Sequence, residues 1–485
     1  HIESGSGRLL DYTTVAKDGV TSGKHLFHAG HILYSKIRPY LAKVVVVDFA
    51  GLCSADMYPV STDLETRFLH RWLVSPMFTE QAAHNQGRTV LPKINQDALA
   101  RLPVPVAPLS EQRRIVAKLE ALQARSRRAR EALDAVPPLL EKLRQSILAA
   151  AFRGDLTKDW RAKHKDAEPA SKLLERIRAE RRKKWEETEL AKLTAKGKTP
   201  KGDEWKAKYK EPEPVDAKGL PELPEAWCWA TAQDICHDIT VGHVGPMESR
   251  YVPTGVPFLR SQNVRANRFD PAELRFIPPD FHAELSKSKL RPGDLVIVRS
   301  GAPGTACVIP DELDDANCAD LVVARLVSLV DPHVMAFYMN SMWARDAVLD
   351  AQVGVAQQHF NVGSMRRLHM PLMPQLEQQL LRARLTDALA AVDAQLSRIG
   401  ELEQRQAHLQ QSVLAKAFRG ELVPQDPNDE PAEVMLARVR AANTVTTNGA
   451  LSKRRKKSAS AKERSTAAES HVDDNDGGPA LVEEG

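Results

Sequence analysis

Two β-rich stretches of the chain carry loop residues that could contact a nucleic acid. Arg, Lys, Gln, Asn and Ser side chains can form paired hydrogen bonds with base edges and single hydrogen bonds with phosphates. The candidates in the first stretch are Lys36, Arg38, Tyr40, Arg88 and Lys93. The candidates in the second are Arg260, Gln262, Asn263, Arg299, Ser300, Gln357, Gln358 and His359. Any single one of them is more often solvated than bound to a base, but as a set they indicate recognition chemistry.

Catalytic motifs are not found in the sequence. There is no Gly-x-x-x-x-Gly-Lys-Ser/Thr phosphate loop and no Gly-x-Gly-x-x-Gly strand–helix junction, so neither an ATP motor nor a dinucleotide site is encoded by those routes. Nor is there an Asn/Asp-Pro-Pro-aromatic tetrapeptide of the kind that holds an adenine in N6-methyltransferases. Pro137-Pro138 is followed by Leu139, and Pro278-Pro279 by Asp280. We therefore expect a non-catalytic chain.

Metal binding is a weaker hypothesis. His25, His28 and His31 are three residues apart, but the segment between them is short and interrupted by Gly30, so one helical face cannot present all three. We interpret them as surface histidines and predict no metal site. The five cysteines include no Cys-x-x-Cys pair, which favours free thiols over a disulfide framework.

Composition describes a moderately basic protein with enough apolar residues for real cores. The chain has 485 residues, 42% of them hydrophobic and 27% charged, with a formal net charge of +5. That length predicts roughly two to four domains. No apolar run reaches the ~18 residues of a membrane span. With the free thiols, this predicts a cytoplasmic protein.

A heptad pattern runs from Ser110 to Arg153 and predicts a long helix. Apolar residues recur there in steps of four and three, which is typical of a coiled-coil seam. Pro137-Pro138 should kink or interrupt this helix, although the pattern keeps its phase. The predicted seam residues are Ile115, Leu119, Leu122, Leu133, Val136, Leu140, Leu143 and Ile147.

The same pattern recurs 266 positions later. Its seam residues are Leu381, Leu385, Val392, Ile399, Leu402, Leu409 and Val413. Residues outside the seam match as well: Pro105 pairs with Pro371, and Glu111-Gln112 pairs with Glu377-Gln378. Both helices end in the repeated Ala-Phe-Arg-Gly-Asp/Glu-Leu. The chain therefore contains two copies of a domain-plus-helix unit.

These patterns divide the chain into six segments. Residues 1–108 form the first mixed domain, 109–156 the first helix, and 157–224 a basic helical insert and linker. Residues 225–374 form the second mixed domain, 375–422 the second helix, and 423–485 a C-terminal extension that we expect to be disordered after about residue 443. The insert carries about 18 Lys/Arg against about 10 Asp/Glu between Thr157 and Lys210. If the two domains are of similar size, the first lacks about 40 residues before His1.

Several of these features resemble the DNA-specificity subunit of type I restriction–modification systems. The resemblance extends to about Ala442, and its most specific parts are Pro108 to Val116, the repeated Ala-Phe-Arg-Gly-Asp/Glu-Leu and Arg291 to Ile297. It implies an α+β architecture in which two target-recognition domains are separated by two long helices that form an antiparallel coiled coil. Each domain would read one half of a bipartite double-stranded DNA site, and the helices would set the spacing.

The resemblance also implies partners. Two modification (methyltransferase) subunits would dock on the helices and domains, and restriction motor-nuclease subunits would join them. S-adenosylmethionine, ATP and Mg²⁺ are expected on those partners, and no cofactor on this chain. The alternative from the residues alone is a coiled-coil scaffold whose mixed domains bind proteins.

Overall fold

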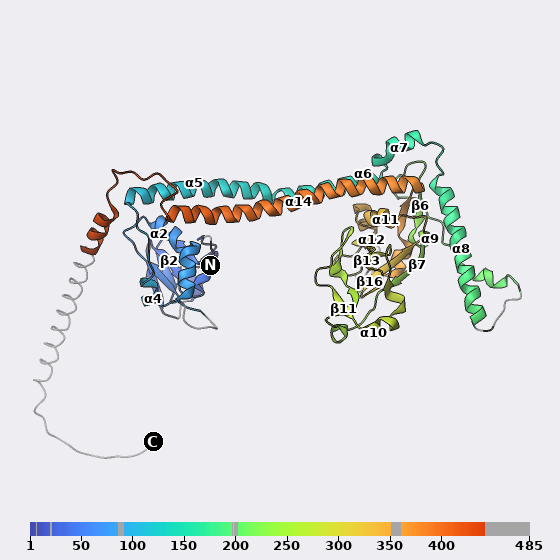
Figure 1. The fold of residues 1–485 in the computed structure, drawn as a ribbon, viewed down its shortest axis with the longest axis horizontal. Coiled ribbons are helices and arrows are strands. Elements are labelled where there is room, and N and C mark those ends of the chain that lie inside the picture. Colours follow the sequence, from blue (N-terminus) through green and yellow to red (C-terminus); the bar gives the residue numbers. More distant parts are fainter. Residues whose placement is uncertain are drawn as a thin grey trace, which may run out of the picture. The chain divides into compact units, whose positions relative to one another are not determined.

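The computed structural model describes residues 1–5, 7–19, 22–85, 92–195, 197, 202–350 and 360–441. The chain forms two compact units: unit 1 comprises residues 1–133 and 401–485, and unit 2 comprises residues 134–400. Each unit joins a β-rich domain to one stretch of paired long helices (Figure 1). The boundary falls inside the long helix α14 (Gln375–Phe418), which contributes to both units.

Unit 1 contains a three-stranded antiparallel sheet of order β3-β2-β5 and a two-stranded sheet β1-β4. Its elements are β1 (Lys24–Phe27), β2 (Ile32–Ser35), η1 (Pro39–Leu41), β3 (Val44–Val46), β4 (Gly51–Ser54), β5 (Met57–Val60), α1 (Val15–Asp18), α2 (Thr66–Leu73), α3 (Pro76–His84), α4 (Gln96–Ala100) and α5 (Leu109–Asp134). The central strand β2 is apolar on both faces because each face covers a different core. Ile32 and Tyr34 pack towards the helices, and Leu33 packs towards β1 and β4.

Helix α2 joins the domain of unit 1 to its long helices. Phe68 of α2 packs against Ile115 and Leu119 of α5 and against Ala417 of α14. Trp72, one turn further along α2, contacts the Phe418 ring at 5.0 Å between centroids. Phe68 and Trp72 are buried and Phe418 is half-buried, so α2, α5 and the end of α14 share one apolar core.

Unit 2 contains two four-stranded sheets, of order β14-β13-β16-β7 and β11-β8-β15-β12. The first consists of β7 (Cys236–Val241), β13 (Leu295–Val298), β14 (Ala306–Val308) and β16 (Leu321–Leu326), and is antiparallel throughout. The second consists of β8 (Val256–Leu259), β11 (Arg275–Ile277), β12 (Lys289–Leu290) and β15 (Ala316–Cys318), in which β8 and β15 run parallel. Two further pairs are β9 (Val264–Arg265) with β10 (Arg268–Phe269), and β6 (Cys228–Thr231) with β17 (His369–Leu372).

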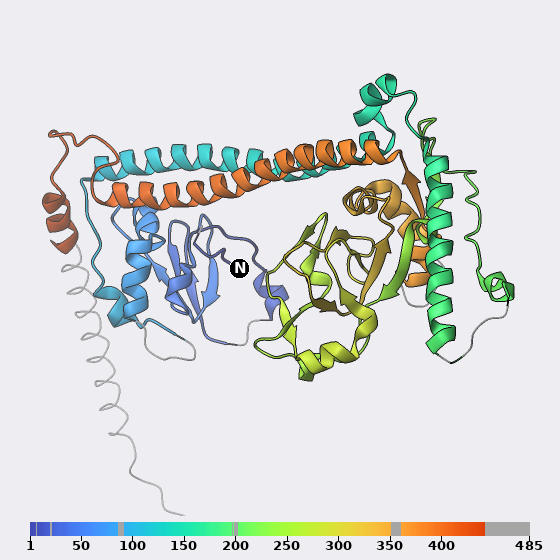
Figure 2. The ribbon, with the colours of Figure 1, turned by 45° about the vertical axis from the view of Figure 1, so that its right-hand side comes forward.

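The run Leu-Val-Ile-Val of β13 is continuously apolar because both of its faces are buried. Leu295 and Ile297 belong to the main core, which lies against the helices. Val296 and Val298 belong to a second core. The helices are α9 (Ala232–Ile235), α10 (Pro279–Glu284), α11 (Pro332–Met339), α12 (Met342–Asp350), α13 (Val362–Arg367) and α6 (Val136–Phe152). In both views α11 and α12 lie between the strands of unit 2 and the α6/α14 pair (Figures 1 and 2).

The basic insert forms helices, as the sequence predicted. It contains η2 (Asp155–Thr157), α7 (Lys158–Lys163), α8 (Ala170–Ala195) and η3 (Glu204–Lys208). The start of α8 is part of the main core of unit 2 through Ala170, Leu173 and Ile177. Further along, Trp185 stacks on Trp205 at 6.1 Å, so η3 folds back onto α8. The predicted linker therefore packs partly on the insert helix.

Contacts within each unit show that the long helices run antiparallel. In unit 1, Gln406 donates to the Ser126 carbonyl at 2.5 Å, and Ile115 lies in the same cluster as Ala417. In unit 2, Arg144 pairs with Asp393, and Thr157 bonds to Glu377. The residue number rises in one helix as it falls in the other. The interruption expected at Pro137-Pro138 is present, because α5 ends at Asp134 and α6 begins at Val136.

The predicted seam is only partly buried. Ile115, Leu119, Leu381, Leu385, Val392 and Ile399 are buried. Leu122, Leu133, Val136, Leu140, Ile147 and Val413 are half-buried. The prediction is wrong for Leu143, Leu402 and Leu409, which are 48%, 46% and 63% exposed. Two paired helices cannot enclose every position of an apolar stripe, so these three leucines face outwards.

The internal repeat is confirmed in the fold. Helix α3 begins at Pro76 and α12 begins at Met342, the same 266-residue offset. The repeated glutamine also makes the same hydrogen bonds in both copies. Gln112 accepts from the Glu65 amide at 2.9 Å and donates to the Ala107 carbonyl, while Gln378 accepts from the Asp331 amide at 2.7 Å and donates to the Met373 carbonyl. Each glutamine thus connects the start of a long helix to the N-terminus of α2 or α11.

Candidate nucleic-acid interface

Unit 1 brings Lys36 and Lys93 together at the end of β2. Both ammonium groups contact Asp56 Oδ1, at 3.2 and 3.1 Å, and Lys36 also donates to the Ala55 carbonyl at 2.8 Å. Burial alone would raise the pKa of the Asp56 carboxyl, but the hydrogen bonds and charges of Lys93 and Lys36 lower it. The carboxylate therefore stays ionised and neutralises one of the two lysines. The cluster keeps a single excess positive charge for a phosphate.

The turn after β2 presents Arg38 and Tyr40. Arg38 has a left-handed backbone with φ of 47°, fixed by the hydrogen bond from its amide to the Pro92 carbonyl at 2.8 Å. Its side chain is exposed, and among the described residues none pairs with its guanidinium. Tyr40, in the 3₁₀ turn that follows, is 50% exposed. This rigid turn can offer a fork of donors and an aromatic ring to a ligand.

In unit 2 the predicted residues Arg260, Gln262 and Asn263 lie in one turn, but they bond to the protein itself. Asn263 is fully buried and donates to the carbonyls of Asp270 and Ala272, so the prediction that it contacts DNA is wrong. Arg260 donates to the Glu273 carbonyl, and Gln262 donates to the Glu273 carboxylate at 2.9 Å. Asn263 shapes the loop because an amide can satisfy two carbonyls at once.

Arg299 and Ser300 also serve the fold. Arg299 donates to Asp320 at 2.5 Å and to the Phe360 carbonyl at 3.2 Å, and its side chain is only 16% exposed. Ser300 donates to the other oxygen of Asp320 at 3.2 Å. These bonds hold the end of β13 against the turn before β16, where Asp320 has φ of 53°. A base-reading role for Arg299 would need this pair to break, so we correct that prediction.

Four predicted residues lie outside the residues that the structure describes. They are Arg88 in the first domain and Gln357, Gln358 and His359 in the second.

Sequence reasoning missed three exposed arginines of unit 2: Arg250, Arg268 and Arg275. Arg250 stacks over the Phe281 ring at 4.9 Å, and Arg275 lies over the Tyr251 ring at 5.7 Å. An aromatic face holds a guanidinium in place while leaving its N–H groups available. The available signal was the alternation of arginines with aromatic residues in this stretch.

Arg268 belongs to the β9–β10 hairpin, which is firmly anchored. Asn340, 1% exposed, donates from its side chain to the Asn267 side-chain oxygen at 2.8 Å. The backbone N–H of Asn267 donates to the Ala306 carbonyl at 2.9 Å. The neighbouring Arg265 pairs with Asp270 at 3.2 Å. The hairpin borders a pocket of about 870 Å³ in unit 2 that three further arginines line, namely Arg144, Arg345 and Arg382. Together with Arg265 and Arg268, five arginines line this recess.

Other site types find little support in the described part of the chain. It holds no group of three or more His, Cys, Asp or Glu arranged to bind a metal ion. None of its helices is both long and apolar enough to cross a lipid bilayer. All five cysteines are free thiols, and burial raises the pKa of Cys236 and Cys307 to about 12.

Residues 5–133 match the family model described as a type I restriction modification DNA specificity domain. Three similar proteins come from Escherichia coli. The specificity subunit of type I restriction enzyme EcoDI is 49% identical over 185 residues, which are 37% of this chain and 42% of that protein. The EcoBI subunit is 25% identical over 351 residues, 72% of this chain and 62% of that protein. The EcoKI subunit is 25% identical over 335 residues, which are 68% of this chain and 59% of that protein.

The chain thus spans less than two thirds of the length of each of these relatives. Two solved structures share the fold. A chain from a type I restriction–modification system, solved for its complex assembly and conformational transition, superposes with a TM-score of 0.60 at 21% identity, over 83% of this chain and 85% of that one. The HsdS subunit from Thermoanaerobacter tengcongensis superposes with a TM-score of 0.50 at 21% identity, over 87% of this chain and 89% of that one. The α+β architecture with two long helices is therefore the architecture of these proteins.

Proposed function

We propose, because this chain belongs to the family of type I restriction–modification DNA specificity subunits, that it is a non-catalytic subunit that binds double-stranded DNA and selects the site on which partner subunits act. The observation that carries this proposal is the duplication. Residues 5–133 match a DNA specificity domain, and unit 2 repeats its helices and its glutamine anchor at a constant offset. Both domains then serve the same task.

Each domain would read one half of a bipartite site. The loops differ between the two copies: Arg38 and Tyr40 stand on a turn in unit 1, while Arg268 and Arg275 belong to strands of unit 2. Different loops on a common framework can read different bases, since base contacts depend on side chain type and position. Lysine and arginine charges would add affinity that is independent of sequence and falls with salt.

The long helices would set the spacing between half-sites and dock two modification subunits. Their exposed leucines support this proposal, because Leu143, Leu402 and Leu409 present apolar surface that two helices leave uncovered. Partner helices that cover such a stripe would bury it in a larger bundle. Restriction motor-nuclease subunits would join the same complex. S-adenosylmethionine, ATP and Mg²⁺ would bind to those partners, and the complex would work in the cytoplasm, where free thiols and DNA are found together.

The first experiment is co-expression with the cognate modification subunit in a host without adenine methylation, followed by long-read mapping of modified bases. We expect N6-methyladenine at one two-part motif with a fixed gap. Replacing Arg38 with alanine should relax one half of the motif, and replacing Arg268 should relax the other. If the intact complex can be purified from the same cells and their genome is nevertheless unmodified, the proposal is refuted.

A second experiment separates this function from a protein-binding scaffold. The purified complex is titrated with duplex DNA at increasing salt. A specificity subunit should lose affinity steeply with salt, because cations on the protein displace counterions from phosphates. A scaffold should show no salt-dependent DNA affinity. Leu402→Glu with Leu409→Glu should prevent co-purification of the modification subunit, whereas Arg405→Glu, an exposed charge on the same helix, should not.

A further inference from the structure

Three helices of unit 1 form a groove of about 520 Å³. It lies between α2, α5 and α14, which run close together in both views (Figures 1 and 2). All of its lining residues belong to unit 1. Its apolar lining consists mainly of Val74, Leu119, Leu122, Val413 and Leu414. We name it the Arg71 groove after the cation in its wall.

Within the described part of the chain, Arg71 is a half-buried cation without a direct counter-ion. Its Nε is buried and has no hydrogen-bond partner, and no described residue forms an ion pair with its guanidinium. Burial lowers the pKa of Arg71, and the carboxylate of Glu120, which opposes this shift, is already paired with Arg67. The charges of Arg67 and Arg127 lower the pKa further. Because a cation that loses water needs an anion in its place, the groove favours an occupant with a carboxylate.

Helix α5 adds further positive charge beside the groove. Arg125 and Arg127 line it, and Arg128 and Arg130 follow on the same helix. All four side chains are exposed, and none forms an ion pair with another described residue. The residues that α14 contributes to the lining are glutamines and apolar residues, which do not neutralise these charges.

The second repeat lacks this excess of charge. The residue that corresponds to Arg71 is Phe337, which is 6% exposed in the core of unit 2. The residue that corresponds to Arg127 is Asp393, and it pairs with Arg144. At the three remaining positions the second helix has Ala391, Ala394 and Leu396. The unpaired arginines are therefore not required by the fold that the two repeats share, and they suit an anion that only the first copy binds.

The same chain contains an acidic segment of matching character. Residues 469–484 lie outside the residues that the structure describes, and residues 465–485 contain no Lys or Arg. The segment contains six carboxylates, namely Glu469, Asp473, Asp474, Asp476, Glu483 and Glu484. The apolar pair Leu481-Val482 directly precedes the last two. Apolar side chains next to carboxylates suit an apolar groove with a cationic wall.

The segment can reach the groove from its place in the chain. Asp429 pairs with Arg114 of α5 at 2.5 Å, so the chain after α14 starts beside the helix that carries the arginines. Along α5 the groove begins at Leu119, about 8 Å from Arg114. About 30 residues separate Ala441 from Asp473, and a polar chain of that length spans roughly 30 Å on average. Because the segment is tethered, its effective concentration at the groove is on the order of 1 mM.

We propose that residues 469–484 dock in the Arg71 groove of their own chain. A carboxylate of the segment bonds to Arg71, Leu481 and Val482 cover the apolar lining, and the other carboxylates lie along the arginines of α5. The docked segment shields these arginines from other polyanions, so the chain binds them more weakly than its exposed charge would predict. This self-contact is independent of whether the chain selects DNA sites.

A fluorescent peptide of residues 466–485 tests the groove directly. The receptor is the full 485-residue chain in which the six carboxylates are replaced by the corresponding amides. Anisotropy should show saturable binding that weakens as salt is added, because the contacts are charged. The unmodified chain should bind the peptide at least about tenfold more weakly, since its own segment already occupies the groove. Equal affinity of the two chains would overturn the proposal.

Variants of the groove and of the peptide locate the contact. Arg71→Met in the receptor should weaken peptide binding at least about tenfold, because a charge-assisted hydrogen bond is lost. Arg405→Met, at an exposed position of α14 outside the groove, should change the affinity less than about twofold. A peptide with Leu481→Ser and Val482→Ser should bind about tenfold more weakly, since it buries less apolar surface. Protection of the Cys53 thiol verifies that unit 1 of each variant is folded.

Heparin binding measures the shielding at constant net charge. Leu481→Ser with Val482→Ser in the full chain removes only the apolar contact, so this chain should bind heparin at least about threefold more tightly than the unmodified chain. Replacing the four arginines of α5 by glutamine in both chains should remove the difference. Unchanged heparin binding by the serine variant, a difference that survives without the arginines, no saturable peptide binding, or unchanged binding to folded Arg71→Met would each contradict the docking.

Discussion

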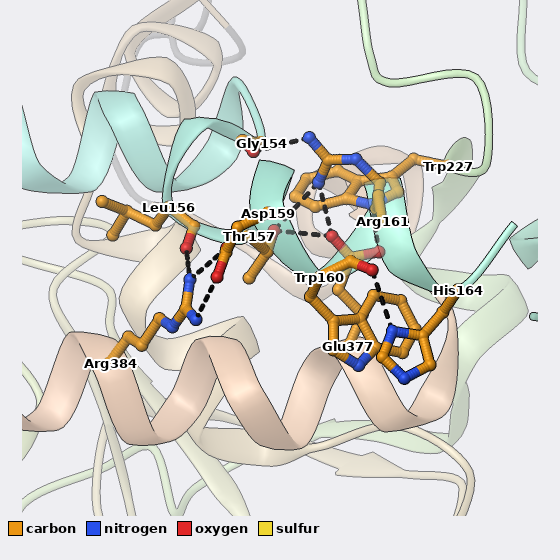
Figure 3. Close-up of polar contacts among 10 residues, drawn as sticks. All are labelled: Gly154, Leu156, Thr157, Asp159, Trp160, Arg161, His164, Trp227, Glu377 and Arg384. Atoms are coloured by element: carbon orange, nitrogen blue, oxygen red, sulfur yellow. Dashed lines mark hydrogen bonds and ion pairs between the residues drawn. The ribbon is translucent and has the colours of Figure 1, made fainter.

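The ion pair between Arg161 and Glu377 should be the most sensitive polar contact of unit 2. The Glu377 side chain is completely buried and that of Arg161 is 18% exposed. Figure 3 shows Arg384 bonded to Asp159 of α7, the helix that also carries Arg161. The two hydrogen bonds, of 2.7 and 2.9 Å, hold α7 where Arg161 can reach Glu377. Replacing Arg161 with methionine keeps the stem over Trp227 but removes the charge and the donors to Glu377, Thr157 and the Gly154 carbonyl.

The expected cost follows from burial. Removing one partner of a buried ion pair costs about 3–5 kcal/mol, because the other charge stays buried without compensation. Thr157 and Trp227 still donate to Glu377, which favours the lower end, about 3 kcal/mol. That value corresponds to a roughly 150-fold increase in the opening equilibrium of unit 2. An exposed pair on the same insert, Arg176 with Glu168, has side chains 52% and 41% exposed, so Arg176→Met should cost less than about 1 kcal/mol.

Thiol labelling measures the two units separately. Cys318 is fully buried in unit 2 and Cys53 is buried in unit 1, so the labelling rate of each cysteine at low urea, read by mass spectrometry, reports the opening of its own unit. Arg161→Met should accelerate labelling of Cys318 and leave that of Cys53 unchanged. Adding Glu377→Gln should recover part of the loss, because it removes the uncompensated charge. If Arg161→Met accelerates labelling no more than Arg176→Met, the pair does not stabilise unit 2 as argued.

Three further predictions test other parts of the structure. Gln112→Leu and Gln378→Leu should each cost about 1–3 kcal/mol, because each leaves the half-buried backbone amide of Glu65 or Asp331 at a helix start without its acceptor. Each substitution should accelerate thiol labelling only of the cysteine in its own unit. Burial, aided by the charges of Arg71 and Arg67, lowers the pKa of His70 to about 4. Between pH 6.5 and 4, therefore, His70 is protonated in the unfolded chain and neutral in the folded chain. Unit 1 should therefore lose up to about 3 kcal/mol as the pH falls from 6.5 to 4, measured by urea titration with a ¹⁹F label on Trp72, and His70→Gln should flatten this dependence. Arg38→Ala should lower the slope of DNA affinity against salt by about one without destabilising unit 1, whereas Arg299→Ala should destabilise unit 2; the reverse pattern would contradict the assignment of Arg299 to the fold.

The architecture was predictable because the sequence contains it twice. The constant offset between Pro105 and Pro371 placed both helices and both domains, and the structure reproduces that offset in α3 and α12. Strands such as β13 were predictable since a run buried on both faces is apolar throughout. The seam was less predictable, because heptad spacing reports which residues share a helix face and not what covers that face. Leu402 and Leu409 keep the spacing and are exposed.

The interface residues were predictable only as a class. Sequence indicates that arginine, lysine and asparagine can bind a base, but the nearest carboxylate or carbonyl in the fold decides whether they are available. Asp320 engages Arg299 from 21 positions away, and Asn263 satisfies carbonyls of a following loop. Such partners come from tertiary structure, so no local pattern could have separated Arg299 from Arg268.

Whether an arginine is already hydrogen-bonded within the protein affects how well it can discriminate between bases. An arginine already bonded to a carboxylate must lose a charge-assisted hydrogen bond before it can donate to a base, and this lost bond offsets the roughly 1–3 kcal/mol that a good bidentate contact discriminates. Arg299 is in that position. Arg38 has no such partner among the described residues, and Arg275 lies over an aromatic ring that leaves its N–H groups available. Discrimination between bases should therefore come from exposed side chains on rigid turns and hairpins, and the buried polar residues of the same loops should act by holding those turns in shape.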